Sequence, residues 1–127
     1  MIDIYKLIEC GCLVTEKFII LRCEYSHNKD ITIYRIMKRD GSSMLDVEHD
    51  LREQKKAFIF SLNVAHKFRK IGLGTEILKF AEEFLKRLNI TELEAVVENL
   101  DWRYRWYLKL GFKQNFHDCR LLIHKNI

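Results

Sequence analysis

Residues 57–75 read AFIFSLNVAHKFRKIGLGT and join two patterns of different period. Over residues 57–64 the sequence begins apolar and then alternates, which is typical of a strand that lies well inside a sheet. From Leu73 to Leu88 apolar side chains recur every three or four residues, and oppositely charged pairs lie four residues apart on the other side. This stretch predicts a buried strand, a short loop and an amphipathic helix over residues 73–88.

The loop over residues 65–75 is basic and carries two glycines where the helix begins. A helix start offers unpaired backbone N–H groups and a partial positive charge, and glycine lets an anion approach the backbone closely. Arg69 and Lys70 add formal positive charge, and the Thr75 hydroxyl is a further donor. These features predict a phosphate site; a tight strand-to-helix turn with solvated basic side chains is the alternative.

Two other phosphate loops do not fit this segment. A dinucleotide-binding fingerprint needs glycine or alanine at position 77, where Ile77 stands. A Walker loop needs Gly-Lys-Ser/Thr where the chain has Gly74-Thr75-Glu76. We therefore expect neither of these nucleotide-binding classes.

The rest of the chain predicts strands on both sides of this segment. Residues 45–51 alternate apolar with acidic side chains, which favours a strand over a short helix capped at Ser43. A helix over residues 102–110 is expected to start at Asp101 and end at Gly111. This order favours one α/β domain over residues 1–127, with a mixed, mostly antiparallel sheet and packed helices. The other expected elements are strands over 16–25, 31–37, 93–97 and 120–125, and a turn over 26–30.

Composition excludes several classes of protein. The 127 residues are 48% hydrophobic and 31% charged, which suits one globular domain and excludes a disordered chain. A net charge of +4 suits a phosphate-bearing ligand but is small for a nucleic-acid binder. Basic and aromatic side chains are interleaved over 67–70 and 103–113, a pattern that nucleic-acid surfaces also show. We interpret these residues instead as contacts for the phosphate groups of a cofactor.

Apolar runs and cysteines bear on location and metal binding. No apolar run approaches the ~20 residues that span a bilayer, and the start lacks the basic residues of a signal peptide, so we expect a cytoplasmic protein and no membrane partner. The spacing of the cysteines matches no zinc site, so we expect no metal and reduced thiols. The cysteines are Cys10, Cys12, Cys23 and Cys119.

Two motifs resemble those of one enzyme family. The pattern Val64-x-x-x-x-Arg69-x-x-Gly72-x-Gly74, between a buried strand and an amphipathic helix, resembles the acetyl-CoA signature of the GNAT superfamily of acyl-CoA-dependent N-acyltransferases. The segment WYLKLGF, residues 106–112, is similar to the family's aromatic-Tyr-x-Lys-x-Gly-Phe segment. Together the matches lie within residues 57–116, nearly half of the chain.

The resemblance implies how acetyl-CoA is bound. The strand over 57–64 would splay from the next parallel strand, and the pantetheine arm would lie in the opening and pair with backbone groups near Leu62 and Val64. Asn99 resembles a polar residue that family members use near the cofactor, although it lies one residue farther from Tyr107 than in the usual pattern. The pyrophosphate would bind the N–H groups of Arg69, Lys70, Ile71, Gly72, Leu73, Gly74 and Thr75.

The resemblance also implies direct acetyl transfer to a primary amine. Tyr107 matches the family's general acid, because its ordinary pKa near 10 keeps it protonated at neutral pH while its oxygen can reach the departing thiolate. Tyr104, one turn earlier, is the substitute. No carboxylate follows Ala57 on the strand over 57–64, so Glu98 is the best acidic candidate for a general base.

The chain departs from the family before Val64. Only 63 residues precede it, which leaves little room for the usual pair of N-terminal helices that form much of the acceptor site. The acceptor pocket is then reduced, open, or completed by a second subunit in a homodimer. Four acidic residues could attract a cationic amine, or could simply form the solvent-exposed side of a strand: Asp46, Glu48, Asp50 and Glu53. A non-catalytic regulator that binds acyl-CoA is the alternative to an enzyme.

Overall fold

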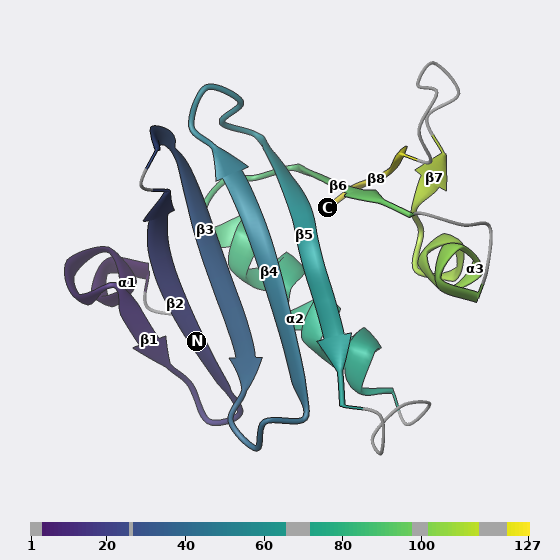
Figure 1. Cartoon of the computed structure of the whole chain (residues 1–127), viewed down its shortest axis with the longest axis horizontal. Coiled ribbons are helices and arrows are strands. Elements are labelled where there is room, and N and C mark those ends of the chain that lie inside the picture. Colours follow the sequence, from purple (N-terminus) through teal and green to yellow (C-terminus); the bar gives the residue numbers. More distant parts are fainter. Residues whose placement is uncertain (1–3, 26, 66–71, 98–101, 115–121) are drawn as a thin grey trace.

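The computed structural model describes residues 4–25, 27–65, 72–97, 102–114 and 122–127. These residues form one mixed sheet in the order β1-β2-β3-β4-β5-β6-β8-β7, with helices packed on it (Figure 1). The expected α/β class with a mostly antiparallel sheet is confirmed. The helices are α1 (Ile4–Cys10), α2 (Leu73–Arg87) and α3 (Trp102–Lys109), and the strands are β1 (Cys12–Val14), β2 (Phe18–Tyr25), β3 (Asn28–Lys38), β4 (Ser43–Asp50), β5 (Lys56–Val64), β6 (Glu92–Val96), β7 (Lys113–Gln114) and β8 (Leu122–Asn126).

The elements follow the sequence patterns closely. Residues 45–50 of the alternating stretch belong to strand β4, because Leu45 and Val47 both point to the packed side of the sheet, and the structure has a strand there instead of the short helix. The turn expected over 26–30 is wrong in extent: β3 begins at Asn28, which pairs with Tyr25 across a bulge. Asp101 and Ser26 lie outside the described residues. The N-terminal stretch contributes both a short helix and a short strand.

One side of the sheet, here called the inner face, packs against α2. Figure 1 shows α2 running behind β3, β4 and β5. Ile77, Ala81, Phe84 and Leu85 form the fully buried stripe of this helix, and Phe84 meets Tyr34 of β3 edge-on at a centroid distance of 5.1 Å. Burial of this apolar surface is the main stabilising contribution to the fold. The buried inner-face residues of the strands include Ile20, Ile36, Leu45, Val47, Ile59, Leu93 and Ile123.

The other side, here called the outer face, carries no helix among the described residues (Figure 1). Its side chains alternate with those of the inner face, as a pleated sheet requires. They are half-buried or exposed apolar groups and ion pairs; Arg35 on β3, for example, holds Asp46 on β4 at 2.9 Å. This face is therefore mixed in character, whereas the inner face is mostly apolar and includes the buried polar residues Thr32, Ser43 and His49.

The parallel strands β5 and β6 part midway along β5. They pair from Lys56 with Glu92 as far as Ile59 with Ala95, whereas β5 continues to pair with β4 up to Val64. A register shift makes Phe60 an extra residue of β5 between two pairs with β4. Such a bulge bends its strand. The bend opens a gap beside residues 60–64, as the expected splay requires.

Candidate active site

The opening between β5 and β6 brings several predicted residues to one place. Leu62 and Val64 lie on β5 beyond its last pair with β6, so their backbone runs along the opening. Gly72, Leu73, Gly74 and Thr75 form the start of α2, which follows β5 after a short loop. Five other predicted residues lie outside the described part of the chain: Arg69, Lys70, Ile71, Glu98 and Asn99.

Gly72 is the N-cap of α2 and has a left-handed backbone conformation, with φ of 83°. Its carbonyl accepts the first helical hydrogen bond, from the Glu76 N–H at 3.0 Å. A Cβ at this position would meet no atom within 4 Å, so crowding is not the constraint. The positive φ alone favours glycine here, because side chains clash with the backbone in that region.

Gly74 is constrained by packing as well as by its place at a possible anion site. A Cβ added there would lie 3.2 Å from Cζ2 of Trp106 and 3.8 Å from Cγ2 of Val64. The indole of Trp106 therefore occupies the space that a side chain at position 74 would need. This is a reason for glycine that a single sequence does not reveal.

Trp106 opens the second motif, but the sequence alone assigned it no role of its own in the site. Its Nε1 donates a hydrogen bond to the Thr75 hydroxyl oxygen at 3.3 Å. The bond and the contact at Gly74 hold α3 against the first turn of α2. Thr75 accepts this bond and keeps its own O–H proton for a second partner. Trp106 thus joins the two sequence motifs in space.

Tyr107 lies next to this contact and is buried. Its ring packs edge-on against Trp106 at 4.9 Å and Phe112 at 5.1 Å. Gly111, with φ of 98°, ends α3, and the Phe112 N–H donates to the Tyr107 carbonyl at 3.1 Å. The predicted end of this helix at Gly111 is confirmed, and Phe112 supplies an apolar contact with Tyr107 there. This packing fixes the direction of the Tyr107 side chain.

Tyr104 is held differently. Its hydroxyl donates a hydrogen bond to Oε1 of Gln114 at 3.0 Å, and its ring is half-buried. That bond joins α3 to β7. Because the Tyr104 hydroxyl serves this contact, Tyr107 is the stronger candidate for chemistry.

Burial raises the pKa of Tyr107 to about 12, and the nearby Arg103 partly opposes this shift. The neutral phenol is therefore favoured in the folded state relative to the unfolded chain. We expect Tyr107 to stay protonated throughout the neutral range. Its contribution to the free energy of unfolding should be constant below pH ~10 and should be lost as pH rises from ~10 through about 12.

Tyrosinate absorbance measured against pH tests this expectation. Tyr107→Phe should remove one tyrosinate transition at the most alkaline end of the titration of the folded protein. Tyr104→Phe, as the matched control, should leave that late transition in place. Loss of a transition near pH 10 in the Tyr107 variant would contradict the shift.

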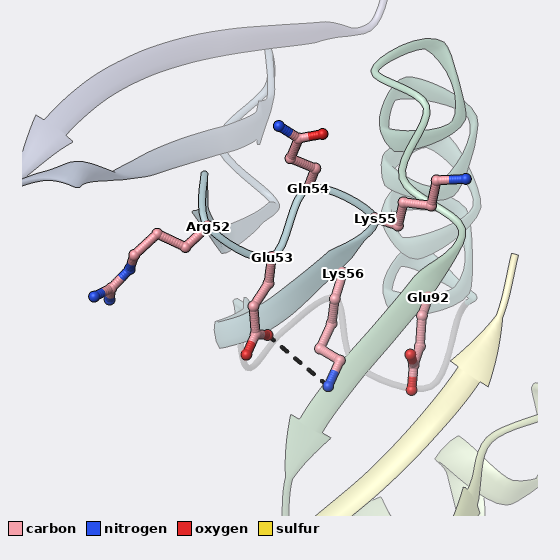
Figure 2. Close-up of a pocket in the computed structure, with 6 residues that line it drawn as sticks. All are labelled: Arg52, Glu53, Gln54, Lys55, Lys56 and Glu92. Atoms are coloured by element: carbon pink, nitrogen blue, oxygen red, sulfur yellow. Dashed lines mark ion pairs between the residues drawn. The ribbon is translucent and has the colours of Figure 1, made fainter.

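Two hollows lie on the described surface, and the second of them reaches Thr75 at the start of α2. One, of about 470 Å³, lies at the start of β5, whereas the glycine turn follows its end. Figure 2 shows its mixed charged lining, in which Lys56 contacts Glu53 at 3.9 Å. A second, of about 300 Å³, lies between α2 and α3. Neither hollow contains Tyr107.

The described residues also bear on metals, thiols and membranes. Within these ranges no group of three or more His, Cys, Asp or Glu side chains is arranged to hold a metal ion. Cys10, Cys12 and Cys23 are free thiols, and Cys119 lies outside the described part. None of the described helices has the length and apolar character needed to cross a membrane.

A sequence profile of the acetyltransferase (GNAT) family matches residues 16–112, well over half of the chain. The chain belongs to the GNAT acetyltransferase family. The match contains both motifs and the strands β2 to β6, of which β5 and β6 flank the opening. A search of curated protein sequences gave no match for this GNAT chain.

Solved structures show the same fold at low sequence identity. The PaiA N-acetyltransferase of Thermoplasma acidophilum, in complex with coenzyme A, is 20% identical with a TM-score of 0.64, and the match covers 80% of this chain and 64% of that one. A GNAT acetyltransferase of Elizabethkingia anophelis with acetyl-CoA bound is 14% identical with a TM-score of 0.64, covering 89% and 100%. The ribosomal-protein-S18-alanine N-acetyltransferase of Escherichia coli is 14% identical with a TM-score of 0.60, covering 79% and 71%.

Proposed function

We propose that this GNAT chain transfers an acetyl group from acetyl-CoA directly to a primary amine. The observation that carries the proposal is the convergence of three features: the opening beside β5, the glycine turn at Gly72, and Tyr107 on α3. The pantetheine arm would lie along residues 60–64 and the pyrophosphate would bind at the start of α2. Coenzyme A and acetyl-CoA bound to proteins of the same fold support this choice of cofactor.

In the reaction the amine nitrogen attacks the thioester carbonyl carbon, the C–N bond forms, and the C–S bond breaks. The thiolate leaves with the electron pair of that bond, and the nitrogen loses a proton to water or to a base. Tyr107 would donate its O–H to the sulfur as negative charge develops there. Glu98 remains our candidate for the base, and Asn99 for a cofactor contact.

The raised pKa of Tyr107 refines its role. A free thiol has a pKa near 8.5, so complete proton transfer from a phenol with a pKa of about 12 is uphill. Tyr107 is therefore better suited to stabilise the departing thiolate by a hydrogen bond that strengthens as the C–S bond breaks. This stabilisation acts in the transition state more than in the bound substrate, which is the condition for raising kcat.

Thermal unfolding with acetyl-CoA, with CoA and with no ligand tests the cofactor. A ligand that binds only the folded state at about ten times its Kd stabilises the protein by about 1.4 kcal/mol. For a domain of this size we expect a rise in Tm of several degrees with either ligand. An unchanged Tm at millimolar acetyl-CoA would overturn the proposed function.

The alternative is a non-catalytic protein that binds acetyl-CoA. It is favoured by the absence of a carboxylate after Ala57 on β5. A clear rise in Tm with acetyl-CoA, together with no release of free CoA thiol across a broad panel of amines and peptides, would support this alternative over the enzyme.

A further inference from the structure

We infer that the acceptor is a primary amine with a single positive charge on an apolar or aromatic group, and that it binds the outer face beside Phe58 and Phe60. The inference rests on the proposed acetyl transfer and names the substrate class of that site. It comes from three observations: two exposed apolar side chains where the strands part, an aromatic ring between two carboxylates, and the distribution of ion pairs on this face.

The exposed apolar side chains are Phe60 and Val96. Phe60 is the bulged residue of β5 and is 60% exposed; Val96 is 40% exposed. Each comes directly after the last pair between β5 and β6, which joins Ile59 to Ala95. Single exposed apolar residues are ordinary, but these two flank the narrow end of the opening. A ligand that reaches the thioester there would cover them.

Phe58 lies one row before the strands part. In the register it stands between Glu48 of β4 and Glu94 of β6, and paired residues share one face of a sheet. Phe58 is half-buried, whereas its neighbours Ala57 and Ile59 are buried on the inner face. An aromatic surface with carboxylates at its edge suits an ammonium group attached to an apolar body.

Ion pairs leave one carboxylate of β4 for such an ammonium. Asp46 is held by Arg35 at 2.9 Å, and Asp50 by Arg52 at 2.8 Å. Glu94, the other carboxylate beside Phe58, is bound by Lys56 at 3.0 Å. Glu48 has no ion-pair partner among the described residues.

One unpaired carboxylate beside apolar side chains matches a single positive charge. A polyamine carries several positive charges and would need several uncompensated carboxylates along its length. The acidic stripe that the sequence suggested for a cationic amine is thus mostly neutralised by its own ion pairs. Charge complementarity therefore favours a monoamine over a polyamine.

The test measures CoA thiol release with acetyl-CoA and three acceptors: 2-phenylethylamine, spermidine and glycinamide. We expect kcat/KM for 2-phenylethylamine to exceed that for spermidine by about tenfold or more, because only the former fills the apolar surface. Glu48→Gln and Phe60→Ala should each raise KM for 2-phenylethylamine about tenfold and leave KM for acetyl-CoA unchanged. Matched controls are Glu83→Gln on the solvent side of α2 and Val14→Ala, which is 54% exposed on β1.

Each outcome has a distinct meaning. Spermidine or glycinamide used as well as 2-phenylethylamine, or unchanged KM values in both Glu48→Gln and Phe60→Ala, would overturn the inference and leave acetyl transfer standing. No thiol release with any amine, despite a rise in Tm with acetyl-CoA, would overturn the enzyme itself. A preference for 2-phenylethylamine that both variants weaken and both controls retain would establish the acceptor class.

Discussion

Tyr107→Phe should lower kcat about 100-fold and change KM for acetyl-CoA by less than about threefold. General acids and hydrogen-bond donors that act on a leaving group contribute about 10²–10⁴ to rate, and the burial of Tyr107 places this donor in a water-poor environment where it is effective. The ring contacts with Trp106 and Phe112 persist in phenylalanine, so the fold and the cofactor site should be preserved. Steady-state kinetics with a reactive amine measure the effect.

Tyr104→Phe is the matched control, because it removes a hydroxyl from the same helix. It should cost only the hydrogen bond to Gln114, about 1 kcal/mol of unfolding free energy, with kcat close to that of the parent protein. A large loss of kcat in Tyr104→Phe, together with an unchanged kcat in Tyr107→Phe, would exchange the roles of the two tyrosines.

Gly74→Val should destabilise the protein by about 1–3 kcal/mol and weaken acetyl-CoA binding by at least about tenfold. The added Cβ would stand 3.2 Å from the Trp106 ring, and the two methyl groups of valine extend farther into the same space. Displacing the indole also breaks its 3.3 Å hydrogen bond to Thr75. Because Trp106 joins α3 to the start of α2, both the free energy of unfolding and the affinity for acetyl-CoA should fall.

Urea unfolding and acetyl-CoA titration of a double-mutant cycle test this contact. Trp106→Leu makes room at position 74, so combining it with Gly74→Val should cost less than the sum of the two single changes. Additive costs would show that the two residues do not meet. Gly72→Ala is a useful comparison, because its added Cβ meets no atom within 4 Å and only the backbone strain at φ of 83° remains.

Features set by local spacing were predictable from the sequence. The strand over 57–64, the helix over 73–88 and the end of α3 at Gly111 depend on side-chain period and on one glycine conformation, and each is confirmed within about one or two residues. The turn expected over 26–30 is too long, because the polar residues of this stretch are compatible both with a turn and with the exposed end of a long strand. Strand pairing with β2 decided in favour of the strand.

Features that join distant parts of the chain needed the tertiary structure. Gly74 and Trp106 are 32 positions apart, and only the packing of α3 on α2 shows that glycine makes room for the indole. The bulge at Phe60 arises from the register with β4, which no local pattern encodes. In the same way, the acidic residues of β4 look equivalent in the sequence, and only the structure shows that Arg35 neutralises Asp46 and Arg52 neutralises Asp50.

The sequence by itself determined the order of the longer strands and helices, the glycine turn at the start of α2, and the family resemblance that the profile match confirmed. These follow from backbone preferences and periodicity, which act over a few residues. Only the tertiary structure decided where β5 and β6 part, which tyrosine hydroxyl is engaged elsewhere, and which carboxylate stays unpaired among the described residues. Those depend on strand register and side-chain contacts between distant segments, and such contacts exist only once the chain has folded.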